Sequence, residues 1–424
     1  MSRAIRAVSV GVVTGAVVAL SATSALPAPA PQTERVTVSA TREQSNGGSG
    51  APALSADGRY AAFASYGSNL VPGDTNDASD IFVRDLRKGT VERVSVASDG
   101  TQADGASHGV TISGNGRYVV FVSSAGNLVA GDELPARSSN VYVHDRRTGR
   151  TERVSRGADG GTASVYGKIA VSHNGRYVVF NAPAGRMEAG ETNFHLAAYV
   201  TDRRTGETRR ISNRTQPEWS VFSLDISADG RYVAYLQRHP RGGRGELWVF
   251  DCRTGTEELA NVTPEGTPST GDAVSVSLSA DGSLVAFSTG AHDVGGGPGP
   301  NSTSGYVRDL RADTTRRIDH DRPGREAFLG TVVLSPDGRY VAYPYGAPTA
   351  GGDFVDNLYV QDLRTGKSRL VSVTTGGGPV TDDHFTLPMS FSRDGRLLIF
   401  ISSSAQLVPD DTNGQADGFV RRLR

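Results

Sequence analysis

Short apolar segments recur along the chain at a regular spacing, each introduced by the same tight-turn motif. Seven copies of Ser-x-Asp/Asn-Gly begin 52 to 59 residues apart, at Ser55, Ser113, Ser172, Ser227, Ser279, Ser335 and Ser392. Each copy is followed by an apolar run, such as YVVF at residues 118–121, in which apolar and polar residues do not alternate. A strand that is apolar on both sides is typical of a sheet covered on both faces.

Three further strand-like segments accompany this run in each unit. A short segment such as VTI at residues 110–112 precedes the serine, and a segment such as DIFVRD at residues 80–85 follows the run. A turn of the type Arg-Thr-Gly then leads into a fourth segment, such as ERVS at residues 152–155. Glycine supplies the positive φ of the turns, and Asp or Asn bonds the turn amides. Seven four-stranded units of this period predict an all-β fold, a seven-bladed β-propeller of antiparallel blades.

The two ends of the repeat region complement each other. The seventh unit ends at residues 419–424 (FVRRLR), which match third strands, so its fourth strand is missing. Residues 33–38 (TERVTV) match the fourth strand TERVS at residues 151–155 almost residue for residue. We therefore expect residues 33–38 to complete the seventh blade and close the ring, which removes an exposed sheet edge. Residues 31–424 then form a single propeller.

The first thirty residues have the features of an export signal. Arg3 and Arg6 precede an apolar run at residues 8–20, and small residues follow up to position 30. The run is too short to span a bilayer comfortably, so we expect no membrane insertion once it is removed. The only cysteine, Cys252, lies far from this leader, which argues against a lipid anchor. It stands where a sister repeat has Leu86, so we expect a small buried apolar side chain and a protein that is secreted or released into the envelope.

The net charge limits the classes of partner. A formal charge of −1 gives no basic excess for nucleic acid or anionic lipid. We therefore expect no nucleic-acid partner.

Two parts of the repeat resemble a known family. The segment SADGRYAAF at residues 55–63, with SPDG at residues 335–338, resembles the repeat of bacterial TolB-like propellers, relatives of the tryptophan-aspartate repeats. The pattern NLVPGDTN at residues 69–76, followed by DIFVRD, is similar to exported TolB-like proteins of actinobacteria. The resemblance covers residues 33–424 and lacks the separate N-terminal domain of TolB. It implies a propeller fold, export, and binding of proteins or saccharides.

Loop lengths divide the predicted ring into two faces. The first-to-second and third-to-fourth turns are short and share one face, whereas the other connections are long and varied, as at residues 66–79, 124–139, 290–304 and 374–385. A binding site is expected on this long-loop face, near the mouth of the central channel. Trp219 and six of the eight histidines fall on that face: His108, His195, His239, His292, His320 and His384. His108, His384 and Trp219 are the predicted binding residues, with solvated loop histidines as the alternative.

Acidic residues form a pattern that repeats in two loops. Asp74, Asn76 and Asp80 in the first unit, and Asp411, Asn413 and Asp417 in the last, place oxygen ligands at spacings faintly like a calcium loop. The invariant glycine and bidentate glutamate of an EF-hand are absent. The alternative is a turn stabilised by Asp and Asn before the third strand, so no cofactor is predicted and calcium is the one candidate.

Two catalytic patterns are weaker than they look. GASHG at residues 105–109 fits Gly-x-Ser-x-Gly, but a β-strand follows where a nucleophile elbow needs a helix. His108, Asp383 and His384 are the candidates for acid-base chemistry, although adjacent residues of an extended loop need not converge.

These observations favour a non-enzymatic scaffold that binds a protein or a glycan through its long-loop face. The alternative is a propeller-type lyase or hydrolase that acts on polysaccharide at the channel mouth, with His108, His384 and Asp383 as its acid-base set. A third hypothesis is a purely structural spacer. The sequence leaves all three open.

Overall fold

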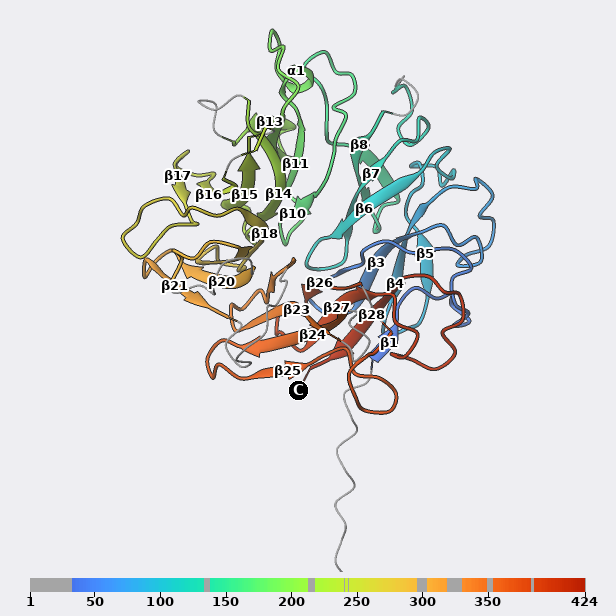
Figure 1. Cartoon of the computed structure of the whole chain (residues 1–424). Helices are drawn as coiled ribbons and strands as arrows, with labels where there is room; N and C mark the ends of the chain where they lie inside the picture. The colour runs from blue at the N-terminus through green and yellow to red at the C-terminus, as the bar shows by residue number, and fades with distance from the viewer. Residues whose placement is uncertain are drawn as a thin grey trace, which may run out of the picture.

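The computed structural model describes residues 33–132, 138–212, 218–239, 241–242, 244–295, 303–318, 330–348, 354–382 and 385–423. They form seven antiparallel four-stranded sheets, arranged as blades around a common centre (Figure 1). The predicted seven-bladed propeller is therefore confirmed. The predicted export signal at residues 1–30 lies outside the described residues.

In blades 1 to 6 the strands follow one another in chain order from the centre of the ring outwards (Figure 1). Blade 1 contains β2 (Ala53–Leu54), β3 (Tyr60–Ser65), β4 (Asp80–Asp85) and β5 (Val91–Arg93), and blade 2 contains β6 (Ser107–Ile112), β7 (Tyr118–Ser123), β8 (Asn140–Asp145) and β9 (Arg150–Arg153). Blade 3 contains β10 (Ala170–Val171), β11 (Tyr177–Pro183), the short helix α1 (Ala184–Met187), β12 (Leu196–Asp202) and β13 (Glu207–Arg210).

The later blades repeat this order. Blade 4 contains β14 (Ser220–Ile226), β15 (Tyr232–Arg238), β16 (Glu246–Asp251) and β17 (Glu257–Leu259), and blade 5 contains β18 (Ala273–Leu278), β19 (Leu284–Thr289), β20 (Ser304–Asp309) and β21 (Thr314–Arg317). Blade 6 contains β22 (Val333–Leu334), β23 (Tyr340–Pro348), β24 (Phe354–Asp362) and β25 (Ser368–Leu370). Blade 7 contains β26 (Thr386–Phe391), β27 (Leu397–Ser402), β28 (Asp417–Arg422) and β1 (Thr33–Arg35).

The N-terminal strand closes the ring as predicted. β1 pairs antiparallel with β28 in the register Thr33 to Arg421, Glu34 to Val420 and Arg35 to Phe419. Figure 1 shows β1 beside β28, at the outer edge of the last blade. The last blade therefore has the same number of strands as the others, and its third strand presents no free edge.

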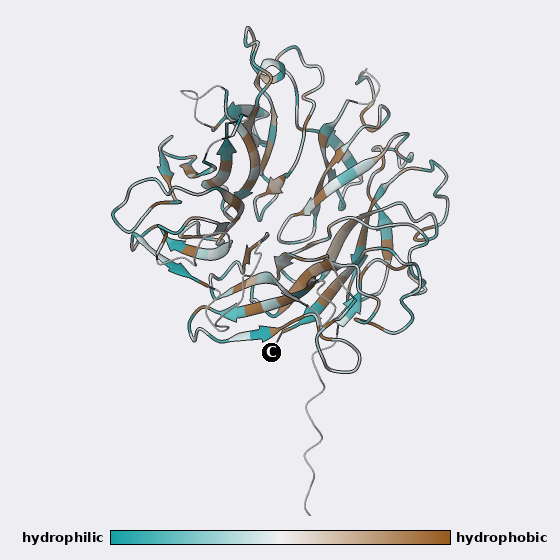
Figure 2. Cartoon of the chain, in the orientation of Figure 1, coloured by the Kyte–Doolittle hydropathy of each residue, from teal (hydrophilic) through white to brown (hydrophobic). Residues whose placement is uncertain are grey.

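The two middle strands of each blade carry the core. All six residues of β4 are buried, as are five of the six in β3. In six blades an aromatic ring of the second strand stacks on one of the third, for example Phe63 on Phe82 at 5.8 Å between ring centroids and Phe400 on Phe419 at 5.6 Å. Figure 2 shows apolar residues along these strands and polar residues on the outermost ones. The non-alternating runs in the sequence are explained by this burial between neighbouring blades.

The repeated turn has two structural roles. In blade 1, Ser55 donates a hydrogen bond to Asp57, which accepts another from the amide of Arg59. The glycine of each turn also lies against the preceding blade: a Cβ added at Gly116 would come within 2.2 Å of the ring of Tyr60. The glycine is thus needed for its positive φ and because a side chain of the preceding blade lies so close to it.

Connection lengths agree with the predicted division into two faces. Residues 55–59 and 86–90 make the two short turns of blade 1, whereas residues 66–79 make its long second-to-third connection. In the part of the chain that the structure describes, no helix is long and apolar enough to cross a membrane.

Candidate functional site

Aromatic side chains are exposed on the long-loop face where blades 3 and 4 meet. Tyr166 lies in the connection between β9 and β10 and is 56% exposed, and Phe194, before β12, is 64% exposed. Phe222 in β14 is 45% exposed, and half-buried Trp219 immediately precedes the same strand. We call these four residues, together with His239 after β15, the aromatic rim.

A β-bulge explains why Phe222 points to solvent. The pairing of β14 with β15 shifts between Val221 and Ser223, which leaves Phe222 without a partner in the ladder. A bulge of this kind redirects a side chain that regular alternation would place on the other face. The guanidinium of Arg238 covers the ring of Phe222 at 5.0 Å, a cation–π distance.

Contacts connect the members of the rim across the two blades. The rings of Trp219 and His239 meet edge to face at 6.4 Å, and His195, next to Phe194, has its Nδ1 3.4 Å from Oγ of Ser220. The backbone next to Tyr166 also approaches β14, since a Cβ added at Gly167 would lie 3.7 Å from the carbonyl oxygen of Phe222. The rim is therefore built from four connections and one strand end, all on the long-loop face where blades 3 and 4 meet.

Of the three predicted acid-base residues, only His108 lies among the residues that the structure describes. His108 lies in β6, and although its side chain reaches solvent, burial by the surrounding protein lowers its pKa. Asp383, His384 and His320 lie outside the described residues. Asp382 accepts hydrogen bonds from Ser404 Oγ at 2.6 Å and from the amide of Ala405 at 3.1 Å, which gives it a local structural role.

The fold explains the Gly-x-Ser-x-Gly pattern around Ser107 and the surroundings of Cys252. Ser107 is buried at the start of β6, and its hydroxyl donates a hydrogen bond to Ser123 at 2.9 Å. A strand follows Ser107, as expected, and not the helix of a nucleophile elbow. Cys252 packs with Tyr177, Trp248 and Phe250 against the core between blades 3 and 4, and burial raises the pKa of its thiol.

The acidic residues whose spacing resembles a calcium loop come together in two matching groups, one around Asp80 and one around Asp417. We call these groups the Asp–Arg–Gln clusters. In the first, Arg93 Nη1 lies 3.3 Å from Asp74 Oδ1 and 3.5 Å from Asp80 Oδ2, and Gln102 donates to the same two oxygens at 2.9 and 3.0 Å. The amide nitrogen of Asn76, not its oxygen, faces Asp80 at 3.2 Å. The carboxylates are therefore compensated by an arginine and by amide donors of the chain itself.

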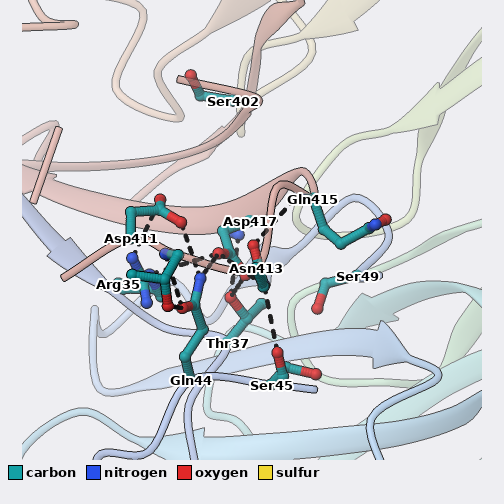
Figure 3. Close-up of polar contacts among 12 residues, drawn as sticks. Arg35, Thr37, Gln44, Ser45, Ser49, Ser402, Asp411, Asn413, Gln415 and Asp417 are labelled. Atoms are coloured by element: carbon teal, nitrogen blue, oxygen red, sulfur yellow. Dashed lines mark hydrogen bonds and ion pairs between the residues drawn. The ribbon is translucent and has the colours of Figure 1, made fainter. Parts of the chain in front are cut away.

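The second Asp–Arg–Gln cluster lies across the ring closure (Figure 3). Arg35 lies 3.0 Å from Asp411 and 3.4 Å from Asp417, while Gln44 donates to these aspartates at 2.8 and 2.9 Å. Thr37 adds a hydrogen bond to Asp417 at 2.6 Å, and Asn413 also donates to Asp417, at 3.4 Å. The aspartates and the asparagine come from the last blade, and their partners come from the N-terminal segment.

Burial raises the pKa of both Asp80 and Asp417, and hydrogen bonds and the nearby arginine act in the opposite direction. Among the residues that the structure describes, no three His, Cys, Asp or Glu side chains are grouped so as to hold a metal ion. The geometry assigns the two clusters to joining segments of the chain, and calcium stays an untested candidate at these oxygens.

Sequence reasoning placed Trp219 and His239 on the long-loop face and missed Tyr166, Phe194 and Phe222. Trp219 stood out because it breaks the repeat on the long-loop face. Tyr166 and Phe194 occupy loops of ordinary composition, and the exposure of Phe222 depends on a bulge that has no local sequence signal. The arginines and glutamines of the two clusters were also missed, because they lie one or two strands away from the acidic pattern.

Comparisons with known proteins support the fold. No protein-family model and no curated protein matches the sequence. Among solved structures, an oligogalacturonate lyase from Vibrio parahaemolyticus is 13% identical and has a TM-score of 0.60, with 93% of this chain and 97% of that chain covered. A second oligogalacturonate lyase, in complex with manganese, is 14% identical with a TM-score of 0.55, with 88% of each chain covered.

TolB structures are also among the similar solved structures. TolB from Acinetobacter baumannii is 15% identical with a TM-score of 0.40, with 78% of this chain and 65% of that chain covered. At such identities the likeness of the two lyase structures concerns the propeller fold alone, because unrelated functions share one fold. The resemblance to the actinobacterial type stays a prediction.

Proposed function

We propose that this protein is an exported, non-enzymatic binding scaffold that holds a partner protein through the aromatic rim. The observation that supports this function is the gathering of Tyr166, Phe194, Trp219 and Phe222 on one exposed surface of the long-loop face. Contiguous exposed apolar groups of a soluble domain mark interaction sites. Large aromatic side chains flanked by arginine are the residues that dominate protein interfaces.

Charged neighbours give this surface a polar border. Arg238 covers Phe222, and Arg186 lies 5.9 Å from the ring centre of Phe194. Asp272 lies 3.9 Å from Arg238 at the side of blade 5. An apolar centre with a charged border is typical of a reversible protein interface.

The experiment removes two rim residues and compares them with an exposed aromatic outside the rim. The double variant Phe194→Ser/Phe222→Ser is tested against Tyr66→Ser, because Tyr66 is 67% exposed on the same face but belongs to blade 1. Proteins retained from secreted and envelope fractions are identified, and the purified partner is titrated by calorimetry. We expect the double variant to weaken binding by about 30-fold or more, as for interface hot spots, and Tyr66→Ser to bind like the wild type.

Two results would contradict the proposal. Equal losses in both variants would show that the effect is not specific to the rim. A glycan array bound by the wild type and lost in the double variant, with no protein retained, would assign the rim to a saccharide.

The alternative of an enzyme that acts on polysaccharide is supported by the two lyase structures with the same fold. It requires His108 to take part in proton transfer together with Asp383 and His384. Loss of activity in His108→Ala on a panel of uronate polysaccharides, with an unchanged melting temperature, would favour it over the scaffold.

A further inference from the structure

A hollow of about 980 Å³ lies on the short-turn face, opposite the long loops, where blades 6, 7 and 1 meet. Five of the side chains that line it are arginines and three are aspartates: Arg339, Arg369, Arg393, Arg396 and Arg422, with Asp57, Asp337 and Asp394. We call it the arginine cleft. The equivalent hollow between blades 4 and 5 has the opposite balance, with four carboxylates and one arginine.

The aspartates of the arginine cleft already have partners in their own turns. Asp57, Asp337 and Asp394 each accept a hydrogen bond from the serine two residues earlier, at 2.5 to 2.7 Å. Each also accepts one from the amide two residues later, at 3.0 to 3.1 Å. These bonds fix the three carboxylates in their turns without removing their charge, and the five arginines outnumber them, so the positive charge of the cleft is only partly compensated.

One ion pair recurs on the short-turn face in five of the seven blades, and we call this recurrence the ring rule. In five blades the arginine after the turn glycine lies over the next tyrosine ring and pairs with the aspartate that ends the third strand. The ion-pair distances are 2.7 Å for Arg59 with Asp85, 2.5 Å for Arg117 with Asp145, 2.5 Å for Arg176 with Asp202, 2.7 Å for Arg231 with Asp251 and 2.9 Å for Arg339 with Asp362.

The last blade reverses this rule. Arg422 occupies the place of the aspartate, since it pairs in register with Leu397 just as Asp85 pairs with Tyr60. Arg396, which should meet a carboxylate at that position, lies next to a second arginine. Its remaining ion pair is with Asp394 of its own turn, at 3.5 Å, and both side chains are exposed.

A further arginine of this cleft lies on a fourth strand, at a position that is acidic in four blades and basic in three. The fourth strands of blades 1 and 2 carry Glu92 and Glu152, which pair with Arg146 and Arg203 of the following blade at 2.5 and 2.8 Å. The fourth strand of blade 6 carries Arg369 at the same place, as blades 3 and 5 carry Arg209 and Arg316. Burial lowers the pKa of Arg369, and the like charge of Arg339 acts in the same direction.

The reversal at Arg422, together with Arg369 of the neighbouring blade, concentrates guanidinium groups around an open hollow. Guanidinium groups bind carboxylate and phosphate oxygens in pairs, and several of them around one concave site recognise more than one anionic group. The hollow is larger than a single inorganic ion needs. We propose that the arginine cleft binds a small polyanion that carries at least two phosphate or carboxylate groups.

The test uses two defined probes and a charge-matched control. Tripolyphosphate and citrate are titrated into the full chain by calorimetry at low and at physiological salt. Arg422→Asp restores the aspartate of the ring rule, so it removes the site and supplies Arg396 with a partner. Arg204→Asp makes the same charge change at an exposed residue of the equivalent hollow between blades 2 and 3.

We expect Arg422→Asp to weaken binding of the probe by about 30-fold or more and Arg204→Asp to change it by less than about threefold. Salt screens the attraction between the probe and a distant arginine more strongly than its attraction to an arginine that it contacts. The melting temperature of Arg422→Asp should equal or exceed that of the wild type, which separates lost binding from lost folding. Arg396→Gln gives a second variant of the same site.

Binding of tripolyphosphate alone, of citrate alone or of both would support the site and would show which anionic group it prefers. The proposal would be overturned if neither probe binds at about 1 mM and low salt, because a binding free energy as weak as about −4 kcal/mol is detectable at that concentration. Equal losses in Arg422→Asp and Arg204→Asp would also overturn it, because the binding would then follow net charge. Variants of the aromatic rim on the opposite face should bind both probes normally, so this test is independent of the proposed function.

Discussion

Replacing Arg35 with alanine tests whether the second Asp–Arg–Gln cluster holds the two ends of the chain together. The side chain of Arg35 is only 8% exposed and lies between Asp411 and Asp417, which are 5% and 0% exposed. In the variant the two carboxylates would face only neutral donors in a buried setting. The cluster joins segments more than 360 residues apart in sequence, so its loss acts directly on the closure.

The size of the effect follows from the burial of these groups. Removing one partner of a buried ion pair destabilises a protein by about 3–5 kcal/mol. The lower end applies here, because Gln44 and Thr37 still donate to Asp417 and because a carboxyl whose pKa is raised by burial takes up a proton more readily. We expect Arg35→Ala to lower the free energy of unfolding by about 3 kcal/mol at pH 7.5.

The first Asp–Arg–Gln cluster provides the control. Arg93→Ala removes an arginine from the same surroundings, but all partners of Arg93 lie within one stretch of blade 1 and its turn. Both variants should lower the urea midpoint. Only Arg35→Ala should increase hydrogen exchange in β1 and β28, because exchange reports the opening of local units before global unfolding.

The dependence on pH checks the electrostatic reasoning. Without Arg35 the pKa of Asp417 rises further above its unfolded value, so the folded state binds the proton more tightly. Such a group favours folding at low pH, and its contribution is lost as pH rises. Arg35→Ala should therefore be less destabilised at pH 5 than at pH 7.5, and adding Asp417→Asn should remove that difference.

Normal exchange protection of β1 in Arg35→Ala would refute the reasoning. Equal opening of β1 and β28 in Arg93→Ala would refute it as well. In the first case the backbone pairing of β1 with β28 would close the ring without help from the buried ion pairs. In the second case the opening would not be specific to the cluster at the ring closure.

Three further outcomes are expected. Gly175→Ala should lower stability by about 2–4 kcal/mol, because its Cβ would lie 2.2 Å from the ring of Tyr118, whereas Gly149→Ala, with the same positive φ and open space, should lose about 1 kcal/mol in thermal unfolding. Asp145→Asn should lose about 1 kcal/mol at pH 7, and this loss should vanish as pH falls from about 4 to 2, since the hydrogen bond from Arg117 lowers the pKa of Asp145 to about 2 and the ionised form then no longer stabilises the fold. Millimolar calcium and chelator should leave the melting temperature unchanged, because an arginine and a glutamine already satisfy the carboxylates of both Asp–Arg–Gln clusters; a calcium-dependent rise would contradict that assignment.

The fold could be predicted because the sequence contains seven copies of one unit and a displaced fourth strand. Each copy supplied the strand order, and the match of residues 33–38 to residues 151–155 supplied the closure that the pairing of Thr33 with Arg421 confirms. These features depend on local patterns that recur. They therefore need no knowledge of contacts between distant residues.

The candidate sites could be predicted only in part, because they depend on which side chains meet in space. The acidic pattern around Asp417 was visible, but its partners Arg35 and Gln44 stand at the other end of the chain. Trp219 was visible as a break in the repeat. The exposure of Phe222 follows from a bulge, and bulges leave no signal in a single sequence.

The repeat itself separates structural from functional residues, because each blade solves the same packing problem. Asp417 stands where two other blades have Asn140 and Asn357, but Asp80 stands at the same position of blade 1 and has a matching cluster. The charge of Asp417 therefore serves the structure of the blade. Arg422 has no such counterpart: six blades place aspartate there, and the last blade places the opposite charge beside Arg396. This reversal leaves Arg396 without the third-strand carboxylate that pairs with the equivalent arginine in five other blades, and a bound anion supplies the compensation that the missing carboxylate would provide.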